Sequence, residues 1–244
     1  RPAGAEEAER RSMSEYTPAR AARRLMRPAG RVSLGTRLEG EASPYVSLAL
    51  VACDQAISPL LFLSDLAQHT RNLMADAHAC LLFDGTGHLP DPLTGARLSL
   101  LGQAEPVDDA RARDRFFRRQ SSADFYRTFG DFRLWRLTPA RGQLVAGFGR
   151  IQWIEAADLR PDPAVSAALA EAEPDILRQI NAEQATLIET LGAQVSGLAD
   201  WRLTGVDPDG ADLRADQQVA RLDFPQPAGD AAGVLAQLRR LADI

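Results

Sequence analysis

Chemically capable side chains are most concentrated between Ser64 and Asn72. The apolar run PLLFL at 59–63 predicts a strand, and Ser64-Asp65 is a helix N-cap sequence. Backbone N–H groups at the start of a helix lack helical partners and attract phosphate. Hydroxyl, amide, imidazole and guanidinium groups follow within two turns, at Ser64, Gln68, His69, Thr70, Arg71 and Asn72. The spacing therefore favours a phosphate site, although an ordinary capped helix with a polar face has the same pattern.

Gly147-Phe148-Gly149 is a second candidate binding feature. It lacks the third glycine and the following helix of a dinucleotide-binding fingerprint. Paired glycines in a strand mark either a bulge or a close approach of the backbone to a ligand. Both interpretations remain open at this level.

The three histidines, His69, His78 and His88, are too scattered for a zinc site of known spacing. We therefore predict no metal site and expect His78 and His88 to be structural or solvated. Candidate nucleophiles such as Ser47 and Ser99 have no recognisable elbow or neighbouring base. Hydrolase chemistry has no support in the sequence.

Composition excludes several other functions. All 28 basic residues are arginine, so a lysine Schiff base and a Walker-type phosphate loop are both ruled out. The 33 acidic residues give a net charge of −5 at pH 7, which argues against a nucleic-acid partner. No apolar run is long enough for a membrane-spanning helix. Cys53 and Cys80 lack CxxC spacing, which predicts free thiols in a reducing, cytoplasmic setting.

Strands must position these residues. Apolar alternation or continuous apolar runs predict strands at 31–38, 45–53, 59–63, 78–83, 96–104, 132–138 and 144–154. Helices are expected at 17–27, after Ser64 and over 107–128. Short antiparallel strands at this spacing favour a small closed barrel of six or seven strands over a doubly wound sheet. The predicted fold class is α+β, mainly β.

The chain is expected to contain two domains. Three prolines between 161 and 174 interrupt the apolar pattern, and an amphipathic helix is predicted over 175–192. Asp207-Pro-Asp-Gly210 is a turn sequence between two short strands, and a helix is expected at 231–242. The predicted divisions are a polar tail at 1–15, a barrel at 16–156, a linker at 157–174 and an α+β domain at 175–244.

Several residues together form a family pattern. They are Pro44, Ser47, Pro59, Ser64-x-Leu66-x-x-His69-Thr70-x-Asn72-Leu73, Ala79-x-Leu81, Arg97–Gly102, Asp131-Phe132, Gly147–Gly149 and Trp153. The pattern resembles the FMN-binding split-barrel superfamily of pyridoxamine 5′-phosphate oxidase, and within it the haem-utilisation branch of HugZ-type proteins. The hairpin at 207–213 and the strand at 221–225 are similar to the small C-terminal domain that often follows this barrel.

The resemblance implies a homodimer with two FMN sites at the subunit interface. The phosphate would lie at the junction from Ser64 to Asn72, and Ser47, Leu48 and Ala49 would run beside the ring system. The strand with Gly147 and Gly149 would approach from the same subunit or from its partner. Gln68-His69 stands roughly where the oxidase has a lysine-containing pair. This implies an FMN-dependent oxidoreductase acting on an unidentified small molecule.

A haem-binding or haem-degrading protein on the same fold is the alternative, and a non-catalytic interaction module is a third. Relatives commonly carry Asn-x-Asp-His at the start of the C-terminal domain, whereas this chain has Asn181-Ala-Glu-Gln184 and no histidine after His88. A C-terminal histidine ligand is therefore absent, and FMN is preferred to haem.

The strands also predict dimerisation without reference to any family. Residues 45–51 and 60–63 are nearly continuous in apolar character, and a strand that is apolar on both faces must be covered on both. An apolar patch is expected around Trp135 and Trp153. A two-fold partner is the commonest cover for such a patch.

Overall fold

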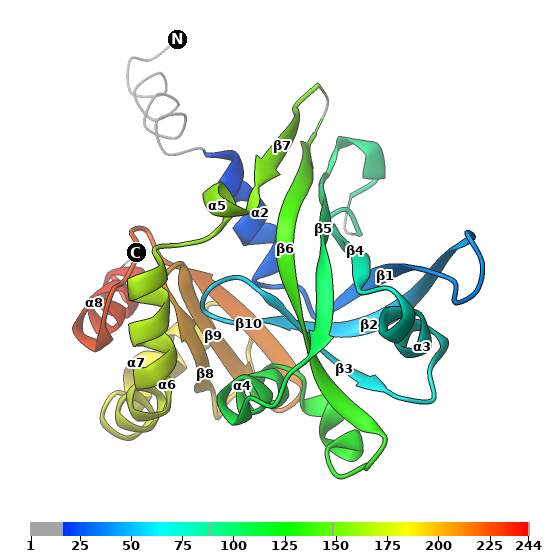
Figure 1. The fold of residues 1–244 in the computed structure, drawn as a ribbon. Helices are drawn as coiled ribbons and strands as arrows, with labels where there is room; N and C mark the ends of the chain where they lie inside the picture. The colour runs from blue at the N-terminus through cyan, green and yellow to red at the C-terminus, as the bar shows by residue number, and fades with distance from the viewer. Residues whose placement is uncertain (1–16, 88, 148, 244) are drawn as a thin grey trace.

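The computed structural model describes residues 17–87, 89–147 and 149–243. Its larger sheet has seven antiparallel strands in the order β3-β2-β1-β4-β5-β6-β7, and β3 also pairs with β6. That pairing closes β1 to β6 into a six-stranded barrel, and β7 extends one edge (Figure 1). The predicted barrel is confirmed. Its strands are β1 Arg31–Arg37, β2 Pro44–Cys53, β3 Pro59–Ser64, β4 His78–Asp84, β5 Ala96–Pro106, β6 Phe132–Ala146 and β7 Ile151–Glu155.

The barrel interior follows from the alternation in the strands. In β1, for example, Val32 and Leu34 are buried and the intervening Ser33 is only partly covered. Inward residues of all seven strands join one apolar cluster with helix α2 (Pro18–Met26). Helix α3 (Gln68–Ala75) packs against β1 and β2. A second cluster on the outside of β2, β3 and β6 is covered by α4 (Ala110–Arg119).

Two predicted elements have different limits in the structure. The strands expected at 132–138 and 144–154 are instead one long β6 and a short β7, because a register shift opposite Gly102 lets Pro139 stay in the sheet. The helix expected over 107–128 ends at Arg119, and a 3-10 segment follows at Ser121–Tyr126. Gln120 interrupts it, because its amide bonds to the carbonyls of Gly30 and Val51 at 2.7 and 2.6 Å.

The C-terminal part holds a three-stranded sheet in the order β10-β9-β8, packed with helices. Its elements are α5 Ala156–Leu159, α6 Pro163–Glu183, α7 Ala185–Ala193, β8 Arg202–Asp207, β9 Gly210–Ala215, β10 Gln218–Asp223 and α8 Ala231–Ala242. Much of the predicted linker is therefore helical. The helix expected from 175 begins at Pro163, since Asp162 caps it and proline is favoured in a first turn.

Buried ion pairs join the two parts of the chain. Asp207 accepts hydrogen bonds from Arg221 at 2.6 and 2.8 Å and lies 3.2 Å from the Arg27 guanidinium. Arg115 of α4 pairs with Glu173 of α6 and lies 3.3 Å from Asp207. Burial alone would raise the pKa of Asp207, but the neighbouring arginines hold it well below its usual range. The C-terminal part is thus fastened to the barrel through matched charges.

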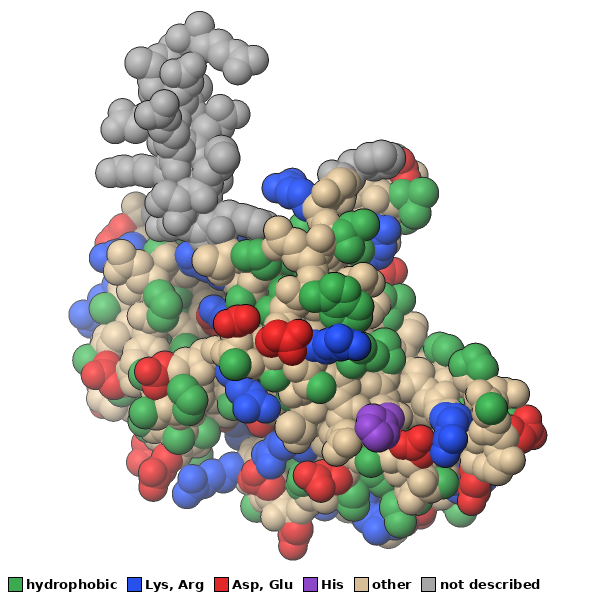
Figure 2. All heavy atoms as spheres, turned by 45° about the horizontal axis from the view of Figure 1, so that its top comes forward, with side chains coloured by type: hydrophobic (Ala, Val, Ile, Leu, Met, Phe, Trp, Pro, Cys, Tyr) green, Lys and Arg blue, Asp and Glu red, His purple; other side chains and the backbone are tan. Residues whose placement is uncertain are grey.

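The remaining surface is mixed. On the face in Figure 2, acidic and basic side chains are interspersed with hydrophobic ones, without a large field of one sign. Within the described residues, no helix is long and apolar enough to cross a membrane.

Candidate functional site

The polar groups at the start of α3 bond mostly to one another. The Ser64 hydroxyl donates to Asp131 at 2.6 Å and accepts from the Leu66 N–H at 3.1 Å. Arg71 donates to the Leu66 carbonyl at 2.8 Å and to Gln68 at 2.6 Å. Ser64, Gln68 and Arg71 lie together at this junction, and each already has at least one hydrogen-bond partner there.

Asn72 and Thr70 are buried rather than presented to a ligand. Asn72 is 0% exposed, donates to the Thr36 hydroxyl at 2.9 Å and accepts from the Glu39 N–H at 3.0 Å. Thr70 is 1% exposed, and its hydroxyl has no partner in the described part of the chain. Asn72 therefore fastens α3 to the end of β1, which is a structural role.

The electrostatics of the junction are mixed for a phosphate. No side chain caps α3, so its first N–H groups keep their affinity for anions. However, His69 lies 3.0 Å from the Ser47 hydroxyl, and burial lowers its pKa, which keeps it neutral at pH 7. The carboxylates of Asp65 and Asp131 lie at the same place, bonded to Arg133 and Ser64 respectively. Asp65 is neutralised by Arg133, so a phosphate there would meet the Asp131 carboxylate and the Arg71 guanidinium, which bonds to the neutral Leu66 carbonyl and Gln68 amide.

Gly147 and Gly149 lie elsewhere in the same chain. Both have positive φ, 89° and 77°, in the turn between β6 and β7. Ser64 pairs with Phe132 at the first residue of β6, whereas this turn follows the last. The two glycines provide the positive φ angles of this turn, and within one chain they are not part of the α3 junction. Phe148 lies outside the described residues.

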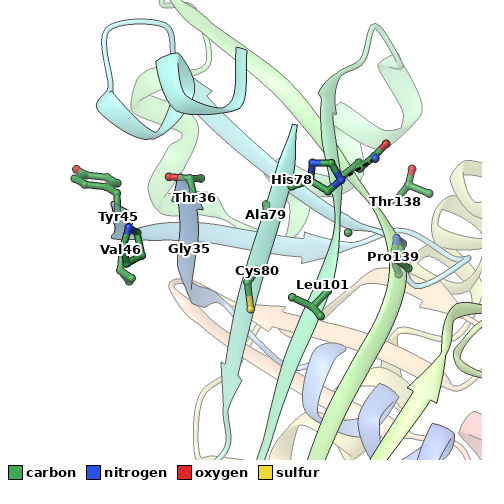
Figure 3. A pocket seen from close by; sticks show the side chains of 14 residues that line it. Gly35, Thr36, Tyr45, Val46, His78, Ala79, Cys80, Leu101, Thr138 and Pro139 are labelled. Atoms are coloured by element: carbon green, nitrogen blue, oxygen red, sulfur yellow. Dashed lines mark hydrogen bonds between the residues drawn. The ribbon is translucent and has the colours of Figure 1, made fainter. Parts of the chain in front are cut away.

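A groove of about 610 Å³ crosses the outer face of the barrel (Figure 3). The strand register explains it: Val46, Gly35, Cys80 and Leu101 lie directly opposite one another across β2, β1, β4 and β5. Residues directly opposite share a face of the sheet, and Gly35 adds no side chain there. The groove is lined by Gly35, Thr36, Pro44, Tyr45, Val46, His78, Ala79, Cys80, Leu101, Gly102, Gln103, Thr138, Pro139 and Ala140.

The sheet around the groove is openly apolar. Val46 and Leu48 are 65% and 68% exposed, and Trp153 is 51% exposed beneath the Arg141 guanidinium, 4.6 Å from its ring. The register places Leu48 and Trp153 in one row across this face. The expected exposure of Trp153 is confirmed, but that of Trp135 is wrong. Trp135 is 1% exposed because it points into the barrel core.

His78 stands at the edge of the groove. Its Nδ1 lies 2.7 Å from Asp76 Oδ1, and its Nε2 lies 3.2 Å from the Gln103 amide nitrogen (Figure 3). Its side chain is 74% exposed. The expectation of a solvated histidine is met, but the sequence analysis missed the partnership with Asp76. The signal was the Asp-x-His spacing at a strand start, which places both side chains on one side.

The two cysteines are free, as expected, and differ in position. Cys53 is buried in the barrel core, and burial raises its pKa to about 12. Cys80 lies on the groove floor, and partial burial raises its pKa as well. Neither thiol is set up as a reactive thiolate. Within the described residues, no group of three or more His, Cys, Asp or Glu side chains could hold a bare metal ion.

The closed antiparallel barrel with a capping helix at α3 defines a split-barrel protein, the class of many flavin- and haem-handling proteins that the sequence pattern resembles. A family profile described as pyridoxamine 5′-phosphate oxidase matches residues 19–146, which is more than half of the chain. The chain therefore belongs to this family.

Individual relatives have a more particular character. The non-canonical heme oxygenase HOZ, chloroplastic, of Arabidopsis thaliana is 36% identical over 110 residues, which is 44% of this chain and 33% of that protein. The chain thus spans only a third of that relative's length. A heme binding protein from Mycobacterium smegmatis is 26% identical, with a TM-score of 0.57 over 94% of this chain and 97% of its own. A protein of unknown function from Agrobacterium tumefaciens is 25% identical, with a TM-score of 0.71 over 94% and 98%.

Proposed function

We propose that this protein binds haem in the groove on the outer face of the barrel. The main support is the groove itself, which is a wide, apolar depression of about 610 Å³, within the size range of small-molecule sites. Two of the relatives above bear haem in their names, and one of them aligns over nearly the whole chain. Both features support the haem alternative over the FMN preference derived from the sequence.

The residues present fit a porphyrin. A porphyrin needs a wide apolar lining, and the row of Gly35, Cys80 and Leu101 contributes part of one to the groove. Its carboxylates need cations at the rim. Arg141 lies opposite Leu101 on the same face and is such a cation. An arginine can bind a carboxylate through two parallel hydrogen bonds.

FMN fits less well. Its phosphate would have to occupy the α3 junction, where His69 is neutral and Arg71 is bonded to Gln68. Ser47 bonds to His69 there, whereas Leu48 is exposed on the outer face. FMN is supported only by the family to which the chain belongs.

Turnover of the haem is a second candidate function. Bound haem supplies oxygen binding and one-electron chemistry, while the protein controls orientation and solvent access. The 36% identity to a heme oxygenase over 110 residues favours an oxidoreductase. The cytoplasmic location remains a prediction, and that relative is named as chloroplastic.

We further propose that the protein is a homodimer through the same face. Val46, Leu48, Ile151 and Trp153, on strands at the two ends of this face, are all more than half exposed, and large exposed hydrophobic side chains on one face are typical of an interaction surface. A second copy would cover this face and cover a bound macrocycle from above. Sedimentation equilibrium at micromolar concentration tests this, and a stable species of 26.5 kDa would contradict it.

Parallel titrations of the full chain with hemin and with FMN test the cofactor. We expect a saturable Soret band at one hemin per chain and no saturable quenching of flavin fluorescence. Saturable FMN binding without a Soret shift would contradict the haem proposal and restore the flavoprotein hypothesis. Binding of neither would favour the interaction module. Loss of the Soret band on adding reductant and oxygen tests turnover.

A further inference from the structure

We propose that His78 is the side chain that ligates the haem iron, and that Asp76 positions its imidazole. This inference rests on the proposed haem binding. A porphyrin supplies four nitrogen ligands, so the protein has to add only one or two. A single well-placed side chain is sufficient, and no cluster of metal ligands is required.

The hydrogen bonds define which ring nitrogen of His78 is available. A carboxylate only accepts hydrogen bonds, so the 2.7 Å contact with Asp76 places the ring proton on Nδ1. The Nε2 atom then carries the lone pair, which is the form that binds a metal. Iron-ligating histidines commonly donate their other ring N–H to a carboxylate or carbonyl, which fixes the ring and raises its basicity.

Asp76 is itself held in place from two sides. Its Oδ1 also accepts the backbone N–H of His78 at 3.1 Å, and its Oδ2 lies 3.3 Å from the Arg37 guanidinium. The carboxylate therefore has little freedom to turn away from the ring. On the other side, the partner of Nε2 among the described residues is the neutral amide of Gln103, at 3.2 Å, which a stronger ligand bond would replace.

Position distinguishes His78 from the other candidate ligands. It is the histidine that lines the groove among the described residues, and its ring lies at the edge of the apolar floor (Figure 3). The Nδ1 of His69 is engaged with Ser47 at the α3 junction. Cys53 is buried in the core, and Cys80 lies on the floor as a thiol. Tyr45 lines the groove from β2, where it pairs with Thr36, and β1 separates that strand from β4, which carries His78.

The test is spectroscopic and uses the full chain reconstituted with hemin. The variants are His78→Ala, Asp76→Asn and, as the matched control, His69→Ala. We expect His78→Ala to move the Soret band, to remove the iron–histidine stretching band of the ferrous form and to raise the hemin Kd at least tenfold. Added imidazole should restore the band. Asp76→Asn should shift the stretching band and weaken hemin binding by about tenfold.

The outcomes separate the two proposals. His69→Ala should leave the spectrum unchanged, and far-UV circular dichroism checks that each variant is folded. A wild-type Soret band and stretching band in His78→Ala would overturn the ligand assignment while haem binding stands. Loss of these signals in Cys80→Ser or Tyr45→Phe instead would overturn it in favour of that residue. Absence of saturable hemin binding by the wild-type chain would overturn both.

Discussion

The outer surface of the barrel has two halves that differ in what covers them. Over the end of β2, over β3 and over the first half of β6, α4 covers the sheet with Phe116 and Phe117. On the other side of α4, its buried Arg115 forms ion pairs with Glu173 and Asp207 of the C-terminal part. Over the start of β2, over β1, β4 and β5, the sheet stays open and largely apolar around the groove, with His78 and Arg141 at its edges.

The difference teaches where to expect a ligand. Removing one partner of a buried ion pair is strongly destabilising, and a charge that is already paired and buried is not available to bind a ligand. An open apolar face with few polar groups at its edge retains that capacity. The covered half therefore gives the chain its architecture, and the open half is the candidate for function.

The largest effect on stability is expected from removing a buried ion pair in the covered half. Asp207→Asn leaves the buried guanidiniums of Arg27 and Arg221 without their shared carboxylate, and such a loss costs roughly 3–5 kcal/mol. Urea denaturation measures it. The matched control is Asp175→Asn, whose partner Arg178 is exposed, and which should cost under about 0.5 kcal/mol. Equal losses of stability in the two variants would refute the distinction between buried and exposed ion pairs.

The same ion pairs predict acid sensitivity. The arginines hold the pKa of Asp207 below its unfolded value of about 3.9. The stabilisation is fully present above that unfolded value and is lost as the pH falls toward the lower folded value. The unfolding free energy of the wild type should therefore decrease from about pH 4 downward, and Asp207→Asn should flatten this dependence. Urea midpoints from pH 6 to pH 3 check it.

An intermediate effect is expected from filling the open half. A Cβ at Gly35 would meet only Cys80, at ordinary contact distances of 3.4 and 3.7 Å, so Gly35→Leu should fold and project into the groove. Hemin affinity should fall at least tenfold, about 1.4 kcal/mol, with little change in stability. Gly197→Leu, where a Cβ meets nothing within 4 Å, is the control. Undiminished binding by Gly35→Leu would place the haem elsewhere.

The smallest effect is expected at the α3 junction. His69→Ala with Arg71→Ala removes one half-buried contact with Ser47 and one exposed pair, at a cost of about 1 kcal/mol in stability. Hemin affinity should stay within about twofold of wild type. If instead the double variant abolishes saturable FMN binding, the junction is a phosphate site after all.

Much of this architecture could be predicted from residue patterns. Alternation along β1 and the apolar runs of β2 and β3 indicated strands, because each strand buries one face against a common core. The helical part of the predicted linker was missed, since its prolines mark a helix start as readily as a break. The cluster from Ser64 to Asn72 lies at the predicted junction of strand and helix, where several of its polar groups have protein partners, and its binding of a ligand stays a prediction.

The sequence by itself determined the class of protein: a closed antiparallel barrel, a polar helix start after β3 and a distinct C-terminal part. Only the tertiary structure decided where the open groove lies. The groove floor joins Gly35, Cys80 and Leu101, which lie far apart in the chain and become neighbours through strand register. Local sequence patterns indicate which face of its own helix or strand a residue lies on. Which polar groups are already paired, and which face outward, depends on elements packed from elsewhere in the chain.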